Sequence, residues 1–205
     1  GLISAEEAFN YTRFRLGSVG RSQHPTIYDN YHGELHITVS KYQIDFNDDC
    51  ESDIGWTTID HTGGVGGDLW HLSEIDCTSP THCWYLGDED TERYNNNMNN
   101  SLVSPEIKLG LNPLLTFIAN VLREQYDFLY LDISTDNWSS YYTEKVTGYG
   151  WYWRPLDISL EVFSGKTIQM RFRVESDESI PFNPDEGIGL FMIEDIQIYS
   201  ERRGR

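Results

Sequence analysis

Oxygen-bearing side chains crowd two short segments of the chain. The first holds Asp45, Asn47, Asp48, Asp49, Glu51 and Asp53, and the second holds Asp88, Glu89, Asp90 and Glu92. Carboxylates this close together repel one another unless a cation lies among them, and Ca²⁺ binds through several hard oxygen ligands. The two segments therefore predict either structural calcium or solvated acidic loops. Neither segment has the spacing of an EF-hand loop.

Aromatic residues alternate near residue 150. Tyr149, Trp151 and Trp153 share one face if the segment is extended, because successive side chains of a strand point to opposite faces. An exposed row of rings stacks on the apolar faces of sugars. The alternative is that these rings pack in the core. Tyr149 and Trp151 are the candidate glycan-binding residues.

Catalytic motifs are not evident in the sequence. His61, His71 and His82 lie close in the chain with acidic residues nearby, but no GxSxG motif or activated-cysteine context accompanies them. The glycine-rich run at residues 63–67 lacks the Lys-Ser/Thr step of a phosphate-binding loop. We therefore predict that the protein is not an enzyme.

The three cysteines are Cys50, Cys77 and Cys83. Cys77 and Cys83 bracket a short turn-rich segment, which favours a local disulfide between them. Cys50 is then left over, either as a free thiol or paired with another chain. The absence of CxxC and HExxH spacing argues against a zinc site.

Glycosylation sequons occur at Asn10, Asn99 and Asn137, each in a polar, turn-like context. The chain opens on Gly1 without a signal-peptide pattern, which is typical of a processed product. Together with the predicted disulfide, these features predict an extracellular protein, secreted or at the cell surface.

The charge of the chain limits its partners. The formal net charge is -18 and the isoelectric point is near 4.5. Such a field repels nucleic acid and anionic lipid, so we exclude both as main partners. No run of 18 apolar residues is present, so no membrane span is expected.

Short strands separated by turn residues must position these groups. Residues 128–134 and 167–175 alternate between apolar and polar side chains, residues 114–119 are an apolar run, and residues 189–199 close the series. Many strands and little helix predict an all-β fold, a jelly-roll β-sandwich of two antiparallel sheets, within one domain.

An ordered set of landmarks across residues 42–200 resembles a known family. The landmarks are Phe46-Asn47-Asp48-Asp49, Gly55-Trp56, Leu69-Trp70-His71, Trp84-Tyr85-Leu86-Gly87, residues 101–109, Leu131-Asp132-Ile133-Ser134, Trp153-Arg154-Pro155-Leu156 and Ile193-Glu194-Asp195-Ile196. In this order they resemble the MAM-like jelly-roll module found beside immune-inhibitor-A-type secreted metallopeptidases and in bacterial cleaved-adhesin domains.

The resemblance implies a non-catalytic module that often carries structural calcium. In this family the first and last strands lie close together, so Asn47 or Asp48 is expected near Asp195. With Asp88 from the second acidic segment, these are the predicted calcium ligands.

Residues 1–40 lie outside the resemblance and form an N-terminal arm. Leu35, Ile37 and Val39 alternate with polar residues and predict a strand. The arm either adds a strand to its own sandwich or completes the open sheet of a neighbour. Strand donation is head-to-tail and can continue into a filament. The jelly-roll domain is then residues 41–200, followed by a basic tail at residues 201–205.

These observations favour an extracellular structural or adhesive subunit that assembles with itself through the arm. The alternatives are a carbohydrate-binding module that accompanies a secreted enzyme, and a protease-associated accessory domain.

Overall fold

The computed structural model describes residues 2–5, 8–9, 11–12, 36–39, 41–64, 70–78, 80–123, 126–146, 150–179 and 189–202; at residues 2–4, 36–39, 150 and 151 the backbone alone is described. The elements are β1 (Leu2–Ser4), β2 (His36–Val39), β3 (Tyr42–Asp48), β4 (Thr57–Asp60), β5 (Trp70–Ser73), β6 (Cys83–Leu86), β7 (Asn99–Val103), β8 (Ile107–Lys108), β9 (Leu111–Leu122), β10 (Phe128–Ser134), β11 (Tyr142–Val146), β12 (Gly150–Ser159), a 3-10 turn η1 (Glu161–Phe163), β13 (Thr167–Glu175) and β14 (Leu190–Glu201).

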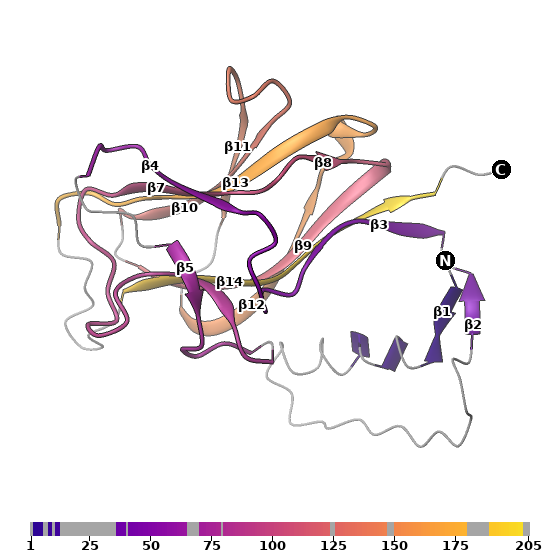
Figure 1. Cartoon of the computed structure of the whole chain (residues 1–205), viewed down its shortest axis with the longest axis horizontal. Helices are drawn as coiled ribbons and strands as arrows, with labels where there is room; N and C mark the ends of the chain where they lie inside the picture. The colour runs from indigo at the N-terminus through magenta and orange to yellow at the C-terminus, as the bar shows by residue number, and fades with distance from the viewer. Residues whose placement is uncertain are drawn as a thin grey trace.

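Strands β3 to β14 form two antiparallel sheets. The first, here the β13 sheet, has the order β11-β10-β13-β7-β4, and β8 pairs with the other end of β13. The second, here the β14 sheet, has the order β12-β9-β14-β6-β5, and β3 pairs with the far half of β14. In Figure 1 the two sheets lie one above the other, with β4, β7 and β13 in the upper layer. The predicted jelly-roll sandwich is confirmed.

The hydrophobic core lies between these sheets. Phe172 of β13 packs edge-on against Phe117 of β9, with ring centroids 5.1 Å apart. Trp56 lies 6.1 Å from Phe172 and 6.0 Å from Trp84 of β6. These rings join the two layers because they come from both sheets. Burial of apolar surface of this kind is the main stabilising contribution to a sandwich.

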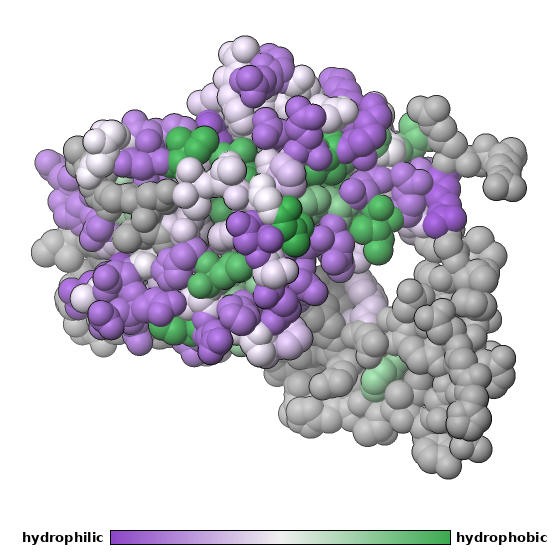
Figure 2. All heavy atoms as spheres, in the orientation of Figure 1, coloured by the Kyte–Doolittle hydropathy of each residue, from purple (hydrophilic) through white to green (hydrophobic). Residues whose placement is uncertain are grey.

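A smaller hydrophobic cluster lies on the outer face of the β14 sheet. Trp84 and Leu86 point into the core, so their strand neighbours Cys83 and Tyr85 point outward. They pack with Leu122, Leu190 and Met192, and with the half-buried Cys77 and Trp153. Elsewhere the surface is mostly hydrophilic, and Figure 2 shows only scattered hydrophobic residues among polar ones on the visible face.

The arm contributes a separate element. β2 pairs antiparallel with β1, with Val39 opposite Leu2, and the two strands make a sheet of their own. The strand predicted around Ile37 and Val39 is therefore present, but its partner is the start of the same chain. Of the two alternatives for the arm, β2 does not add a strand to the chain's own sandwich. Leu35 lies outside the described residues. No helix in the described part of the chain has the length and apolarity to cross a membrane.

Candidate functional site

The outer face of the β13 sheet carries a fully buried carboxylate, Asp132 of β10. Strand register places it between Arg171 of β13 and Thr143 of β11. Its Oδ2 accepts hydrogen bonds from Arg171 Nε at 2.8 Å and Arg173 Nε at 2.6 Å, and its Oδ1 accepts one from the Thr143 hydroxyl at 2.8 Å. One carboxylate thus fixes two guanidinium groups that lie at alternate positions of one strand.

Aromatic rings cover these guanidinium groups. The guanidinium carbon of Arg171 lies 4.4 Å from the ring centroid of Trp138 and 4.7 Å from that of Tyr141. Arg173 lies 4.7 Å from the ring of Tyr130. Arg171 and Arg173 are only 7% and 8% exposed, whereas Tyr141 is 50% exposed. The site is therefore a layer of fixed cations with an exposed aromatic layer above part of it.

A tight turn between β10 and β11 holds Trp138 in this place. The Ser134 hydroxyl donates to Asp136 Oδ1 at 2.9 Å and accepts the Trp138 N–H at 2.9 Å. Asp136 also accepts the N–H of Ser140 at 3.0 Å and its hydroxyl at 2.6 Å. Asn137 and Trp138 adopt positive φ angles of 54° and 66°, which reverses the chain within the turn. These bonds fix the ring over Arg171.

The two arginines differ in how many acceptors they have. Arg173 donates through Nε and a terminal amino group to Asp132, and through its other amino group to Glu175. Arg171 donates through Nε alone. Within the described chain its two terminal amino groups make no hydrogen bond, and they reach solvent. Arg171 therefore has donors left for a ligand.

The charge state of the site follows from these contacts. Burial alone would raise the pKa of Asp132, but the hydrogen bonds from Arg173, Thr143 and Arg171 outweigh burial and hold this pKa below its ordinary value. Burial and the nearby Arg171 and Arg173 lower the pKa of His61. At neutral pH the site therefore contains an ionised carboxylate, two guanidinium cations and a neutral imidazole.

Smaller side chains from β7 and β4 continue this face. His61 Nε2 lies 2.8 Å from the hydroxyl of Ser101, which is opposite Arg173 in the sheet. A serine next to a histidine suggests a nucleophile and its base. Ser101 is fully buried, however, and the carboxylate of Asp60 binds Thr62 instead. The pair is therefore a structural contact, and His61 and Ile59 are both exposed on this surface.

The other histidines of the sequence cluster lie elsewhere. His71 of β5 lies 3.1 Å from Glu89, and His82 lies 3.4 Å from Glu51 and 3.5 Å from Glu74. His71 lies in β5 and His82 directly precedes β6, both strands of the β14 sheet, whereas His61 follows β4 of the β13 sheet. The three histidines do not form one site.

The four predicted calcium ligands do not come together. Asp48 lies opposite Ile196 near the middle of β14, whereas Asp88 bridges to Arg93, which bridges to Gly189 just before β14 begins. At about 3.3 Å per residue this separates Asp88 from Asp48 by roughly 20 Å. The strands do bring Asn47 and Asp48 near Asp195, which forms a bulge with a φ of 50°.

The carboxylate of Asp48 accepts hydrogen bonds within the core. It is buried, and its Oδ2 accepts the indole N–H groups of Trp56 at 2.6 Å and Trp84 at 3.1 Å, while its Oδ1 accepts the Cys50 N–H at 2.8 Å. Asn47 accepts a hydrogen bond from Gln197 at 2.6 Å. Across the described ranges no group of three or more His, Cys, Asp or Glu side chains is placed to hold a metal. The Asp48 oxygens are thus already engaged by N–H donors, and calcium binding stays a prediction.

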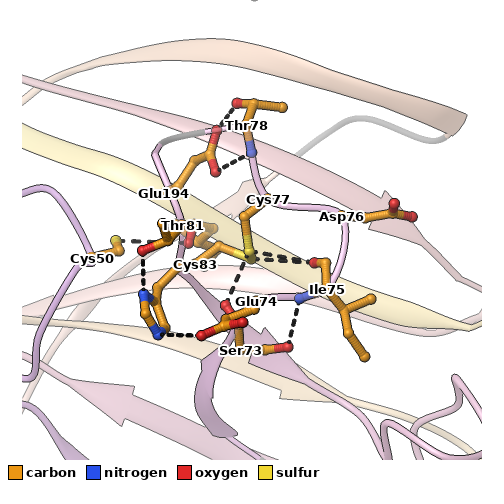
Figure 3. Close-up of a disulfide and its surroundings, with 12 residues drawn as sticks. Cys50, Ser73, Glu74, Ile75, Asp76, Cys77, Thr78, Thr81, Cys83 and Glu194 are labelled. Atoms are coloured by element: carbon orange, nitrogen blue, oxygen red, sulfur yellow. Dashed lines mark hydrogen bonds and ion pairs between the residues drawn. A yellow bond between two sulfur atoms is a disulfide. The ribbon is translucent and has the colours of Figure 1, made fainter.

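Cys77 and Cys83 form a disulfide, with their Cα atoms 5.5 Å apart (Figure 3). The loop that it closes is tied to the β14 sheet: the N–H of Thr78 donates to Glu194 at 2.9 Å, and the Thr78 hydroxyl donates to the same carboxylate. Glu194 is fully buried beneath this loop. The disulfide and the carboxylate together hold the loop on the outer hydrophobic cluster.

Cys50 is a free thiol and is fully buried. Burial raises the pKa of its thiol, which keeps it protonated and unreactive. Full burial in this chain favours the free thiol over pairing with another chain.

The predicted glycosylation sites differ in access. Asn137 is exposed in the β10–β11 turn. Asn99 is half-buried in β7, and its Oδ1 is buried without a hydrogen-bond partner. Asn10 lies outside the described residues. Glycosylation stays a prediction at all three sites, and the geometry favours Asn137.

The aromatic row near residue 150 is described only in part. Tyr149 and the side chain of Trp151 lie outside the described residues. Trp153 is half-buried in the outer cluster and donates its indole N–H to the Asp76 carbonyl at 2.9 Å. Its neighbour Tyr152 is 74% exposed. The row is therefore not a uniformly exposed platform.

No protein-family model matches the chain, and no curated protein sequence matches it. Solved structures do match it. The K3 cleaved adhesin domain of Lys-gingipain from Porphyromonas gingivalis has a TM-score of 0.54 and 17% identity, over 78% of this chain and 99% of that one. The K1 domain of the same protein has a TM-score of 0.52 and 16% identity, over 77% and 98%.

A third match is the glycoside hydrolase domain of Endo-D from Streptococcus pneumoniae, with a TM-score of 0.52 and 12% identity, over 73% of this chain and 22% of that one. Identities this low show the fold alone. The adhesin-type part of the sequence resemblance agrees with these matches, and the MAM-like part stays a prediction.

The arginine site was not predicted from the sequence, although a signal was present. The alternation of β13 points Arg171 and Arg173 to the same side, away from Met170 and Phe172. Two arginines on the outer face of one strand are conspicuous in a chain of formal charge -18. The sequence could not supply their partner Asp132, because pairing between β10 and β13 is non-local.

Proposed function

We propose that the chain is an extracellular, non-catalytic binding module, and that the outer face of its β13 sheet binds carbohydrate. The observation that carries this proposal is the pair of nearly buried arginines, Arg171 and Arg173, stacked against Trp138, Tyr141 and Tyr130. Sugars offer apolar ring faces and many hydroxyls. Aromatic rings beside fixed hydrogen-bonding groups are complementary to both.

The rigidity of the site supports binding. Asp132 fixes both guanidinium groups, and the hydrogen bonds of Ser134 and Asp136 fix the turn that carries Trp138. Groups that are already ordered lose little conformational entropy when a ligand binds, so more of the contact energy appears as affinity.

An extracellular location is supported by the Cys77–Cys83 disulfide, since disulfides persist mainly in oxidising compartments. The likeness to domains named cleaved adhesins is compatible with adhesion through such a surface. A non-catalytic role is supported by the burial of Ser101, which makes it inaccessible to a substrate, and by the hydrogen bonds of Asp60 to Thr62, which leave His61 without an orienting carboxylate among the described residues.

Replacement of Tyr141 tests the proposal. Tyr141→Ala removes an exposed ring from the site, so we expect glycan binding to weaken about tenfold, in the range for loss of one stacking contact at a binding hot spot. The melting temperature should change little, because Tyr141 is 50% exposed. Binding is measured against a glycan array and then by calorimetry with the best glycan.

The matched control is Tyr152→Ala, which removes a 74% exposed tyrosine from the other sheet. Trp151→Ala tests the alternative aromatic row. If Tyr141→Ala binds every glycan as the wild type does, the proposed face is not the site. Loss of binding in Trp151→Ala alone would move the site to β12.

Head-to-tail self-assembly through the arm is the second candidate. Two observations favour it. The strands β1 and β2 belong to neither sheet of the sandwich, and an apolar row on the β14 sheet is exposed, with Ile44 at 60% and Leu114 at 39%. An arm from a neighbouring copy could cover this row. Light scattering tests assembly: particles larger than a monomer that disappear on removal of residues 1–40 would support it.

A chain that neither binds glycans nor assembles would be an accessory domain that acts only in folding.

A further inference from the structure

The distribution of charge on the proposed site is unusual for this chain. A connected set of contacts joins Arg171, Asp132, Arg173 and Glu175 by ion pairs, and extends through the rings of Tyr130 and Phe128 to Lys145, whose Nζ lies 3.1 Å from the Phe128 ring centroid. The guanidinium of Arg123 also lies 5.0 Å from the Phe128 ring centroid, so four cations meet two carboxylates in the described part of this set, although the chain as a whole carries -18. Cations therefore outnumber carboxylates in the described part of this set.

Arg171 is the cation of this set whose terminal amino groups are free to donate hydrogen bonds to a ligand. Arg173 has Asp132 and Glu175 as acceptors, whereas Arg171 shares Asp132 and has no second carboxylate. Its terminal amino groups reach solvent beside Trp138 and Tyr141, yet the residue is only 7% exposed. A cation that is mostly removed from water is stabilised by a second anionic partner. None of the described residues supplies that partner to Arg171.

We propose that Arg171 receives the carboxylate of an acidic sugar, so that the ligand is a uronic-acid- or sialic-acid-bearing glycan. This inference rests on the proposed function and names its ligand class. The two terminal amino groups of a guanidinium match the two oxygens of a planar carboxylate, and such paired hydrogen bonds are about twice as strong as neutral ones. The rings of Trp138 and Tyr141 lie beside the same guanidinium, where they contact the sugar ring that carries the carboxylate.

An acidic sugar fits this arrangement better than an acidic peptide. A peptide carboxylate lies at the end of a flexible chain that must be ordered on binding. A uronic or sialic carboxylate is attached directly to a rigid ring, and the aromatic side chains lie next to Arg171 rather than along a sheet edge.

The test compares one sugar with and without its charge. The probes are oligogalacturonate and sialyllactose, each compared with its own methyl ester, in which only the carboxylates differ. Calorimetry on the full chain should show at least about tenfold tighter binding of one acidic member than of its neutral counterpart. The pair of probes that shows the preference identifies the ligand as a uronic or a sialic acid. The preference should weaken as salt is raised, because charge attraction is screened.

Variants assign the preference to Arg171. Arg171→Gln should bind the acidic and neutral members equally, while Arg154→Gln, which removes an exposed arginine from the β14 sheet, should keep the preference. If circular dichroism shows that Arg171→Gln does not fold, Arg171→Lys is used instead to test the role of Arg171. Lysine keeps a positive charge beside Asp132 but lacks the paired N–H donors of a guanidinium group, so this variant should lose most of the preference.

The outcomes separate this inference from the proposed function. Equal binding of acidic and neutral members, lost in Tyr141→Ala, would overturn the acid specificity and keep the carbohydrate site. A preference that survives in Arg171→Gln, or in Arg171→Lys where that variant decides, would overturn the role of Arg171. Binding of a polyglutamate peptide, but of neither acidic sugar, would overturn the ligand class. No binding of any sugar would overturn both proposals.

Discussion

At the scale of the residue, Asp132 is the group on which the candidate site most depends. It is fully buried and accepts hydrogen bonds from Arg171, Arg173 and Thr143. Asp132→Asn would leave two nearly buried cations without their shared anion, so we expect the free energy of unfolding at pH 7 to fall by about 3 kcal/mol. Urea unfolding measures this change. Glu175→Gln is the control: the side chain of Glu175 is 44% exposed, and loss of its charge should cost less than about 1 kcal/mol. Equal effects of the two variants would show that Asp132 does not hold the site together.

The contribution of Asp132 to the free energy of unfolding should also depend on pH. Its pKa in the folded protein is lowered below the ordinary aspartate value of about 3.9. A lowered pKa contributes stability above the unfolded pKa, and this contribution is lost as the pH falls through the folded pKa. The difference between the wild type and Asp132→Asn should therefore be constant from pH 7 to about 5 and shrink below about pH 4. A difference that grows in acid would contradict the ionised, hydrogen-bonded state of Asp132.

At the scale of the element, the disulfide loop on the outer face of the β14 sheet is the segment most dependent on a covalent link. Cys77 and Cys83 are six positions apart, and a loop of this length is expected to contribute about 2 kcal/mol. We expect the double variant Cys77→Ser, Cys83→Ser to melt about 4 °C or more below the wild type. The wild type in reductant should behave like the double variant, and the double variant should not respond to reductant. An unchanged melting temperature would mean that Thr78 and Glu194 hold the loop without the disulfide.

Single strands were predicted well, and their neighbours were not. The alternation at residues 128–134 and 167–175 gave the bounds of β10 and β13, because apolar periodicity is a local property. The sequence could not show that Asp132 lies opposite Arg171, since register depends on packing between distant segments. The sequence could not show for the same reason that the four predicted calcium residues lie apart: acidic residues close in sequence can have different partners, as Asp48 has in Trp56 and Trp84. The turn-like context of Asn137 was evident in the sequence, but the left-handed conformation of Asn137 and Trp138, which places a ring over Arg171, was not.

At the scale of the whole molecule, the sandwich and the arm are separable in their described parts. β3 begins at Tyr42, the Arg202 N–H donates to the Lys41 carbonyl at 2.8 Å, and β1 pairs only with β2. The core therefore closes within residues 41–202. The binding face belongs to β10, β11 and β13 and lies on the sandwich, so binding and assembly involve different surfaces.

This separation predicts the behaviour of a chain that lacks residues 1–40. Its sandwich keeps every strand of both sheets, so we expect its melting temperature to stay within about 4 °C of the wild type, a shift equivalent to about 1–2 kcal/mol in a domain of this size. Glycan affinity should be unchanged, because no group of the site comes from the arm. Light scattering of the same two samples reports assembly independently: oligomers that persist without the arm would end the strand-donation hypothesis while leaving the binding face untouched. If the truncated chain unfolds, the sandwich does not fold without the arm. The arm would then have to contact the sandwich by means other than strand pairing, because β1 and β2 belong to neither of its sheets.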